Sequence, residues 1–339
     1  MTENLQDIAQ AMVAKGKGIL AADESSGTIK KRFDSINVES TEDNRRDYRE
    51  MLFRCTDAMR DHISGVILFD ETIRQKAADG TLLVDIMTAA GSIPGIKVDA
   101  GAKPLAGAPG EKVTEGLDGL RERLAEYHGL GARFAKWRAV IDIAEAVPST
   151  YSIDANAHAL ARYAALCQEQ KIVPIVEPEV IMDGSHSIER CFDVTEQVLK
   201  TVYEQLYVHR VNLEGTILKP NMVVSGTECA EQAGVDKVAE MTVTCLRRCV
   251  PAAVPGICFL SGGQSDEDAT AHLSAMNAGY DMPWQLSFSY GRALQAAPLK
   301  AWGGKPENVA AAQAAFAHRA RMNGLAATGD WMAEHEQAA

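Results

Sequence analysis

Eight short apolar segments recur along the chain, each with the length of a β-strand and bounded by glycine, proline or charged residues. They are Gly18–Ala22, Gly65–Phe69, Gly95–Val98, Ala132–Trp137, Val173–Val176, Gly215–Leu218, Gly256–Leu260 and Gln285–Ser289. Segments with helical spacing of apolar residues lie between them, at Ala155–Gln170, Ile188–Val208, Val235–Arg248, Asp266–Ala278 and Pro306–Asn323. Alternating strands and helices predict βαβ units and a parallel sheet.

The spacing of these segments selects between two parallel-sheet architectures. Successive strand ends lie about 30–45 residues apart, the length of one βα unit. Eight such units predict an α/β fold of the (β/α)8 TIM-barrel type. A doubly wound open sheet would need a glycine-rich turn after its first strand, and the sequence has none there. We expect one barrel domain over residues 1–324 and a flexible tail over residues 325–339, which is short, polar and alanine-rich.

Charge and composition narrow the classes of function. The net charge of −12 disfavours nucleic-acid binding, so any phosphate site must gather its own cations. No apolar run reaches the roughly 18 residues of a membrane span, and the N-terminal segment reads as an amphipathic helix rather than a signal peptide. We expect a cytoplasmic protein without a membrane or nucleic-acid partner.

Cysteines and histidines indicate neither a disulfide framework nor a metal centre. The seven cysteines are dispersed and odd in number, as in proteins of a reducing compartment. The eight histidines fall mostly on predicted helices and loops and lack metal-ligand spacing such as HExxH. We therefore expect no metal and no other cofactor.

Polar side chains mark the C-terminal ends of the predicted strands, where TIM barrels carry their catalytic groups. These residues are Asp23, Asp70, Glu71, Asp99, Lys136, Arg138, Glu177, Glu179, Lys219, Ser261, Ser289 and Arg292. Strand ends without a function would be more varied, so the pattern indicates a site at the barrel mouth.

Lys219 is the strongest candidate for covalent chemistry. It ends the strand in GTILKPNM, and Lys136 ends another strand at the same mouth. Taken alone, a strand-end lysine more often reaches into solvent, but two ammonium groups in a partly dry site are expected to lower each other's pKa. A neutral lysine can form a Schiff base with a ketone. The resulting iminium withdraws electrons and weakens an adjacent carbon–carbon bond.

Two carboxylates complete the candidate catalytic set. Glu177, in IVEPE, either only neutralises the lysines or also shuttles protons during Schiff-base chemistry. Asp23, after GILAA, is either a helix N-cap or the group that takes a proton from a substrate hydroxyl. The polar ends of the other strands favour the catalytic role.

Two small-residue loops are candidate phosphate sites. LSGGQS and SYGRA follow the seventh and eighth predicted strands and lead into helices. Loops in this position often bind phosphate in TIM barrels, because backbone N–H groups are exposed near helix N-termini. Their candidate substrate-binding residues are Ser261, Gly262, Gly263, Ser289, Gly291 and Arg292.

Taken in order along the chain, nine segments resemble class I fructose-bisphosphate aldolases. They are LAADESSGTIKKRF, NRRDYR, GVILFDETI, GIKVDAG, FAKWR, IVPIVEPE, LEGTILKPNM, FLSGGQS and FSYGRALQAAPLKAWGG. The resemblance implies a metal-free, usually tetrameric TIM barrel. It also implies reversible cleavage of fructose 1,6-bisphosphate to dihydroxyacetone phosphate and glyceraldehyde 3-phosphate, in glycolysis and gluconeogenesis.

The same resemblance implies roles for individual residues. Lys219 would form the Schiff base, Glu177 would transfer protons, Lys136 would tune the site electrostatically, and Asp23 would assist cleavage between the third and fourth sugar carbons. The loop residues Ser261, Gly262, Gly263, Ser289 and Arg292 would hold one phosphate. The other phosphate would be held by Ser25, Thr28, Lys31, Arg32 and Arg138.

The chain departs from the family pattern at two places. Ala100 stands where the family commonly has a lysine, in VDKG, and Lys103 is a possible replacement for that cation. The family often ends in a tyrosine that assists proton transfer, but here no tyrosine follows Tyr290. Two alternatives therefore stay open: the same chemistry on another phosphorylated ketose, such as fructose 1-phosphate or sedoheptulose 1,7-bisphosphate, and a non-catalytic binding protein on this fold.

Overall fold

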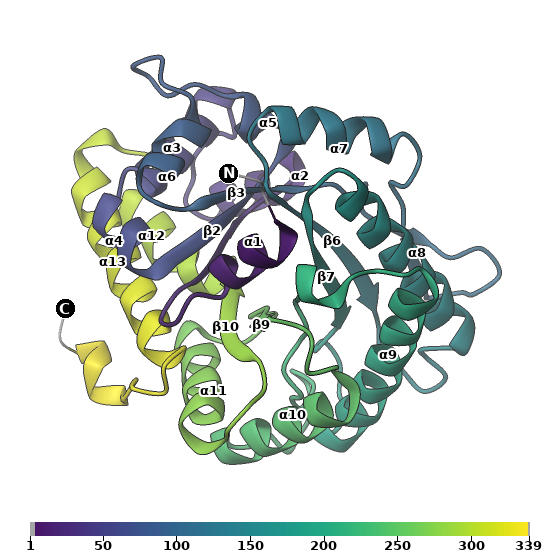
Figure 1. Ribbon diagram of the computed structural model, residues 1–339. Helices are drawn as coiled ribbons and strands as arrows, with labels where there is room; N and C mark the ends of the chain where they lie inside the picture. The colour runs from purple at the N-terminus through teal and green to yellow at the C-terminus, as the bar shows by residue number, and fades with distance from the viewer. Residues whose placement is uncertain (1–3, 338–339) are drawn as a thin grey trace.

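A closed barrel of parallel strands forms the centre of the computed structural model, which describes residues 4–337 (Figure 1). Around the barrel the strands follow chain order, and the last pairs with the first. They are β1 (Gly18–Ala22), β2 (Ile63–Leu68), β3 (Ile93–Lys97), β6 (Phe134–Ile141), β7 (Val173–Val180), β8 (Ile217–Leu218), β9 (Gly256–Phe259) and β10 (Gln285–Tyr290). The predicted TIM-barrel fold is confirmed.

Helices surround the barrel (Figure 1). They are α2 (Ser26–Asp34), α3 (Glu42–Phe53), α4 (Thr56–His62), α5 (Asp70–Arg74), α6 (Leu83–Ala89), α7 (Leu120–Gly129), α8 (Thr150–Glu169), α9 (Ile188–Val208), α10 (Val235–Cys249), α11 (Asp266–Gly279), α12 (Arg292–Trp302) and α13 (Val309–Ala326). Short 3-10 turns η1 (Leu213–Gly215), η2 (Pro306–Asn308) and η3 (Ala333–Gln337), and a hairpin of β4 (Ala102–Pro104) and β5 (Lys112–Thr114), complete the described chain. No helix of residues 4–337 is both long and apolar enough to cross a membrane.

Serine N-caps explain where three of the long helices begin. The hydroxyl oxygens of Ser149, Ser187 and Ser265 each accept a hydrogen bond from the backbone N–H three residues later, at 3.2, 3.3 and 3.0 Å. Such a bond satisfies one of the free donors in the first helical turn. Helix α8 therefore starts five residues before the predicted Ala155, in a segment whose alanine-rich pattern is weaker.

Two strands extend beyond their predicted ends. β6 continues to Ile141 rather than Trp137, and β7 to Val180 rather than Val176. The predictions ended where charged residues interrupt the apolar run. Because strand side chains alternate between the two faces, these charged residues can face the barrel mouth while the strand continues.

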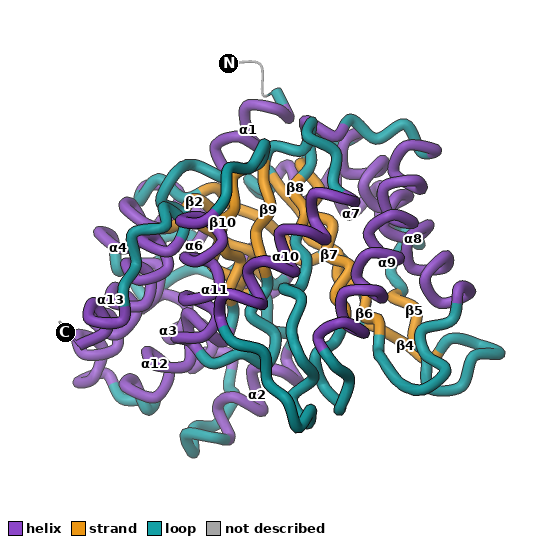
Figure 2. The backbone as a smooth tube through the Cα atoms, turned by 90° about the horizontal axis from the view of Figure 1, so that it is seen from below, coloured by secondary structure: helices purple, strands orange, loops and turns teal. Residues whose placement is uncertain are grey.

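The first helix, α1 (Leu5–Met12), covers one end of the barrel. Its residues Ala9 and Met12, with Val13 beyond its end, join a buried cluster that contains the inward-facing strand residues. The strand members are Ile19, Ala21, Ile67, Phe134, Val173, Ile175, Ile217 and Cys258. In Figure 2, α1 lies at one end of the barrel and α2 at the other. The N-terminal opening is therefore closed by apolar packing, and the polar mouth lies at the opposite end.

The C-terminal segment makes specific contacts with the barrel helices. α13 continues to Ala326, so the predicted domain boundary at residue 324 falls inside a helix. Glu336 accepts a hydrogen bond from Arg319 at 2.6 Å and another from the Trp331 indole at 3.0 Å. Buried Arg319 in turn donates to the hydroxyl of Thr270 on α11, at 2.7 Å. The flexibility predicted for residues 325–339 stays a prediction.

Candidate active site

A cavity of about 560 Å³ opens at the C-terminal ends of the barrel strands. It brings together nearly all of the residues proposed from the sequence. Those lining it are Asp23, Ser25, Thr28, Lys31, Arg32, Lys136, Arg138, Glu177, Lys219, Ser261, Gly262, Ser289, Gly291 and Arg292. Residues far apart in sequence therefore share one concave site, as expected for a TIM barrel.

Gly263 is the proposed residue that does not line this cavity. Its backbone N–H donates instead to the sulfur of Met182, at 2.8 Å. Among the other strand-end residues, Glu71 forms ion pairs with Arg45 and Arg49 outside the cavity. Asp99 lies behind the cavity wall, where it pairs with Lys97 at 2.8 Å.

Four lining residues with polar side chains were given no role from the sequence, and of these only Glu179 was among the strand-end residues: Glu24, Ser35, Lys97 and Glu179. Lys97 lies inside the apolar run GIKV, and in β3 it pairs in register with Lys136 of β6. A charged residue within an otherwise apolar strand is the signal that could have identified it. Lys103, the suggested substitute for a cation at Ala100, is exposed on β4 and does not line the cavity.

The candidate catalytic residues form a continuous chain of ion-pair contacts. Lys219 Nζ lies 3.1 Å from Glu177 Oε1, and Lys136 Nζ lies 3.3 Å from Glu177 Oε2. Lys136 Nζ also donates to Asp23 Oδ2 at 2.7 Å. The two lysines and Glu177 are each at most 4% exposed. Charges this far from solvent interact strongly with one another.

Lys136 does not have the lowered pKa that we expected from its proximity to a second lysine. Burial disfavours its charged form, but Asp23, Glu177 and Asp99 outweigh burial and raise the pKa of Lys136. Burial also opposes ionisation of Asp23, yet Lys136 and Lys219 outweigh it and lower the pKa of Asp23 to about 2. Lys136 is therefore a permanent cation and Asp23 a permanent anion near neutral pH.

A buried network supports the cationic wall of the cavity. Arg32 forms an ion pair with Glu24, which is itself buried. Glu24 Oε1 also accepts a hydrogen bond from Gln295 at 2.8 Å, and the backbone carbonyl of Glu24 accepts one from Arg49 at 3.0 Å. Because a carboxylate holds the guanidinium, the orientation of Arg32 is fixed before any anion arrives.

Both candidate phosphate loops precede helices, as predicted. Ser261 and Gly262 lie before α11, and Ser289 and Gly291 lie before α12, whose first residue is Arg292. Arg292 donates to the backbone carbonyl of Gly262 and so joins the two loops. The hydroxyl of Ser289 is buried at the cavity wall and has no hydrogen-bond partner among residues 4–337. An anion at this position would satisfy that hydroxyl.

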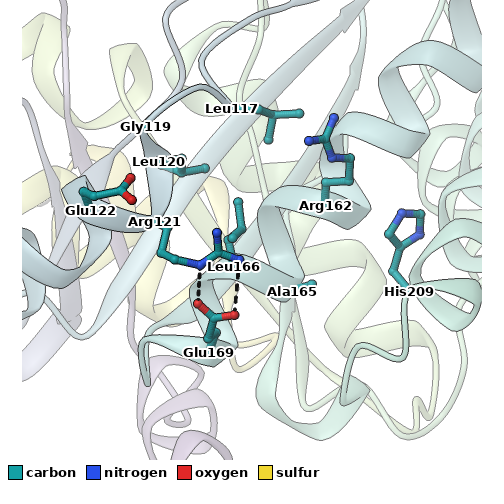
Figure 3. A pocket seen from close by; sticks show the side chains of 10 residues that line it. All are labelled: Leu117, Gly119, Leu120, Arg121, Glu122, Arg162, Ala165, Leu166, Glu169 and His209. Atoms are coloured by element: carbon teal, nitrogen blue, oxygen red, sulfur yellow. Dashed lines mark hydrogen bonds and ion pairs between the residues drawn. The ribbon is translucent and has the colours of Figure 1, made fainter.

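A second hollow, of about 460 Å³, lies outside the barrel between α7, α8 and the end of α9 (Figure 3). Its lining includes Arg162, His209 and an exposed ion pair between Arg121 and Glu169 at 2.6 Å. None of the proposed site residues lies there. In the described part of the chain, no group of three or more histidine, cysteine, aspartate or glutamate residues is arranged to hold a metal ion.

Comparison with known proteins identifies the family. The family model described as fructose-bisphosphate aldolase class-I matches residues 4–339. The chain belongs to the class I fructose-bisphosphate aldolase family. The resemblance read from the nine sequence segments is thereby confirmed, and the protein is an enzyme, a carbon–carbon lyase.

Relatives of this aldolase match it along almost its whole length. A probable fructose-bisphosphate aldolase class 1 from Xanthomonas axonopodis pv. citri (strain 306) is 62% identical over 330 residues, covering 97% of this chain and 98% of the relative. Fructose-bisphosphate aldolase B from Homo sapiens is 55% identical over 331 residues, covering 97% and 91%. The fructose-bisphosphate aldolase of Plasmodium falciparum, solved with TRAP and a small-molecule inhibitor, superposes with a TM-score of 0.95 at 51% identity, covering 97% and 95%.

Proposed function

We propose that this aldolase cleaves fructose 1,6-bisphosphate reversibly to dihydroxyacetone phosphate and glyceraldehyde 3-phosphate through a Schiff base on Lys219. The observation that carries the proposal is the contact chain from Lys219 through Glu177 to Lys136 and Asp23 in the barrel mouth. In this proposal Lys219 is the nucleophilic amine and Glu177 the proton-transfer group, Lys136 is the fixed cation and Asp23 the fixed anion, and all four line one cavity. The proposed pathways are glycolysis and gluconeogenesis.

The first stage is formation of the iminium. Glu177 Oε1, 3.1 Å from Lys219 Nζ, accepts a proton from the ammonium group. The neutral amine attacks the C2 carbonyl of the open-chain ketose and forms a carbinolamine. Glu177 then returns a proton to the departing hydroxyl, and water leaves. Lys136, whose pKa is raised, keeps its charge throughout and lies 3.3 Å from Glu177 Oε2.

The second stage breaks the bond between C3 and C4. The C4 hydroxyl loses its proton to Asp23, the electron pair of the C3–C4 bond moves into the iminium, and glyceraldehyde 3-phosphate leaves. With a pKa of about 2, Asp23 is a weak base, so the electron sink rather than its basicity drives the transfer. The remaining enamine takes a proton at C3, which we assign to Glu177, and hydrolysis releases dihydroxyacetone phosphate.

The phosphate groups are assigned to two groups of residues that line the cavity. Ser261, Gly262, Ser289, Gly291 and Arg292 would bind one phosphate through hydroxyl, backbone N–H and guanidinium donors. A second group of lining residues, Ser25, Thr28, Lys31, Arg32 and Arg138, would bind the other. These cations offset the net charge of −12 locally.

The proposal also covers the cellular location and the oligomeric state of the aldolase. We expect the aldolase to act in the cytoplasm as a homotetramer, the usual state of its family. Tyr207 and Val208, at the end of α9, are 83% and 61% exposed and offer apolar surface to a second copy. Analytical ultracentrifugation measures the assembly state directly.

Borohydride reduction in the presence of dihydroxyacetone phosphate tests the proposal. The expected result is covalent labelling of Lys219, located by peptide mass spectrometry, together with loss of activity. Labelling of another lysine, or activity that survives stoichiometric labelling, would refute the Schiff-base assignment.

Ala100 stands where the family commonly has a lysine, and this difference keeps a second substrate under consideration. The residue lies in the loop after β3, where its N–H donates to the Glu115 carbonyl at 2.8 Å, and it does not line the cavity. Loss of a lysine there would weaken one phosphate contact and favour a ketose with a single phosphate. Lys97 lines the cavity and supplies a cation from the same strand, so we retain the bisphosphate. The ratio of kcat/KM for fructose 1,6-bisphosphate to that for fructose 1-phosphate distinguishes between these two substrates.

Replacing Arg292 by alanine is expected to lower kcat/KM about tenfold to a hundredfold. A hydrogen bond to a charged group typically contributes about 1.5–3 kcal/mol, and about 1.4 kcal/mol corresponds to a factor of ten. Steady-state kinetics with fructose 1,6-bisphosphate measures the effect. Unchanged kcat/KM would remove Arg292 from the phosphate site.

Deleting residues 329–339 is expected to leave the chemistry largely intact but to destabilise the fold. The described part of the tail holds no tyrosine, so kcat should fall less than about tenfold, below the usual contribution of a general acid. The free energy of unfolding should fall by about 3 kcal/mol, because buried Arg319 loses Glu336 and keeps only oxygen partners on α11. Denaturant titration and initial rates separate the two effects. A hundredfold loss of kcat in the folded truncated protein would show a proton-transfer group in the tail, with His335 the first candidate.

A further inference from the structure

Met182 packs against the phosphate loop but does not line the cavity. Its sulfur accepts a hydrogen bond from the backbone N–H of Gly263 at 2.8 Å. A Cβ atom built on Gly262 would lie 3.0 Å from this sulfur, and one built on Gly263 would lie 3.2 Å from it. The thioether therefore fills the space that any side chain at residues 262 and 263 would need.

Gly262 has the conformation that makes this support necessary. Its φ is +55°, in the left-handed region that side-chain-bearing residues rarely adopt. Two consecutive glycines have more backbone freedom than any other pair, and an unsupported loop would lose that freedom on binding phosphate. Arg292 holds the Gly262 carbonyl from one direction, and Met182 holds the Gly263 N–H from another.

The segment that carries Met182 is itself fixed at the barrel mouth. The N–H of Ile181 donates to the Ile141 carbonyl at the end of β6, at 2.8 Å. The Met182 carbonyl accepts from Thr227 and the Gly184 carbonyl accepts from Glu228, both at 2.8 Å. The loop after β7 is thus bonded to the loop after β8, and Met182 extends this connection to the loop after β9.

We propose that Met182 is a positioning residue for phosphate binding, which holds residues 261–263 in the conformation that presents Ser261 and Gly262 to the cavity. The proposal rests on the assignment of this loop as a phosphate site under the proposed function. Met182 touches neither the cavity nor the lysines in the described contacts, so it acts through Gly263. A thioether is a weak acceptor, and it orients the N–H without competing with the donors that face the cavity.

The test compares Met182→Leu with a matched control, Met282→Leu. Leucine keeps most of the volume of methionine and removes the acceptor, so the fold is retained. Met282 is also partly buried, but it lies before β10, at the end of the barrel away from the mouth. The concentration of dihydroxyacetone phosphate that gives half-maximal trapping by borohydride should rise about threefold to tenfold in Met182→Leu, the range of one neutral hydrogen bond. It should not change in Met282→Leu.

Dihydroxyacetone without phosphate separates loop positioning from a general structural effect. Its half-maximal concentration should be the same in the wild type and in Met182→Leu. An equal rise for both ketones would place the effect at Lys219 and overturn the proposal. An unchanged or lower value for dihydroxyacetone phosphate would also overturn it, since a freed Gly263 N–H would then help phosphate binding or play no part.

Titration with inorganic phosphate tests the role of Met182 independently of the covalent chemistry at Lys219. Calorimetry should show binding weakened by the same factor in Met182→Leu and unchanged in Met282→Leu. If the wild type binds phosphate but neither ketone is trapped, the Schiff-base proposal fails while the Met182 comparison still holds. Equal phosphate affinity in the wild type and Met182→Leu would reject the role of Met182 alone.

Discussion

Replacement of Lys219 by alanine is expected to lower kcat by about 10⁵–10⁶-fold, which is comparable to the loss of kcat when a covalent nucleophile is removed from other enzymes. Without the amine no iminium forms, and the C3–C4 bond has no electron sink. Lys219 is buried beside Glu177 and has no other ion-pair partner among residues 4–337. The change therefore removes the nucleophile and leaves the Lys136–Asp23 pair in place.

Lys219→Arg is the informative companion variant. Arginine keeps the positive charge next to Glu177 but cannot lose its proton to become a nucleophile. Both variants should lose activity and borohydride labelling together, while fructose 1,6-bisphosphate still binds. Retention of more than about one-hundredth of wild-type kcat in Lys219→Arg would mean that this position contributes charge rather than covalent chemistry.

Glu177→Gln is expected to lower kcat by about 10²–10⁴-fold, the contribution of a positioned acid–base group. Glutamine preserves the size of the side chain but cannot accept a proton from Lys219 or return it to the carbinolamine. Initial rates and the yield of borohydride trapping measure the two steps, and trapping should slow by a similar factor.

Glu179→Gln is the matched comparison for Glu177. Glu179 lies two residues further along β7 and lines the same cavity, but it pairs with Arg138 rather than with either lysine. Its replacement should act mainly on KM and lower kcat less than tenfold. Equal losses of kcat in the two variants would argue that Glu177 provides only negative charge.

The fold was predictable from the sequence because apolar periodicity reports local structure. All eight predicted strand segments overlap barrel strands, and Ile188–Val208 coincides with α9. The predicted ends of β6 and β7 were wrong for a physical reason: Arg138 and Glu177, where the apolar runs stop, are inside strands and line the mouth. The sequence predicted a helix after SYGRA but not its range, because Pro298 interrupts the helical pattern within α12.

The composition of the site was more predictable than its electrostatics. Most site residues follow from their position near strand ends, but the raised pKa of Lys136 depends on Asp99 and Asp23, which only the folded barrel brings near. Lys97 was not predicted because it lies inside the apolar run GIKV and not at its end. The contact of Gly263 with Met182 joins residues 81 apart in sequence, and no local pattern indicates such a pairing.

The covered end of the barrel has a consequence for how the protein is made. α1 is synthesised before every strand that it covers, yet the apolar side chains that it packs against extend to Cys258. At about 5–20 residues per second, roughly 10–50 s pass before that strand has been synthesised. Throughout this interval the apolar face of α1 has only part of its native packing, because Ile19 and Ile67 are already made but Cys258 is not. Newly made chains therefore leave part of this apolar surface uncovered until the seventh barrel strand is synthesised, and chaperone demand should be highest during this interval.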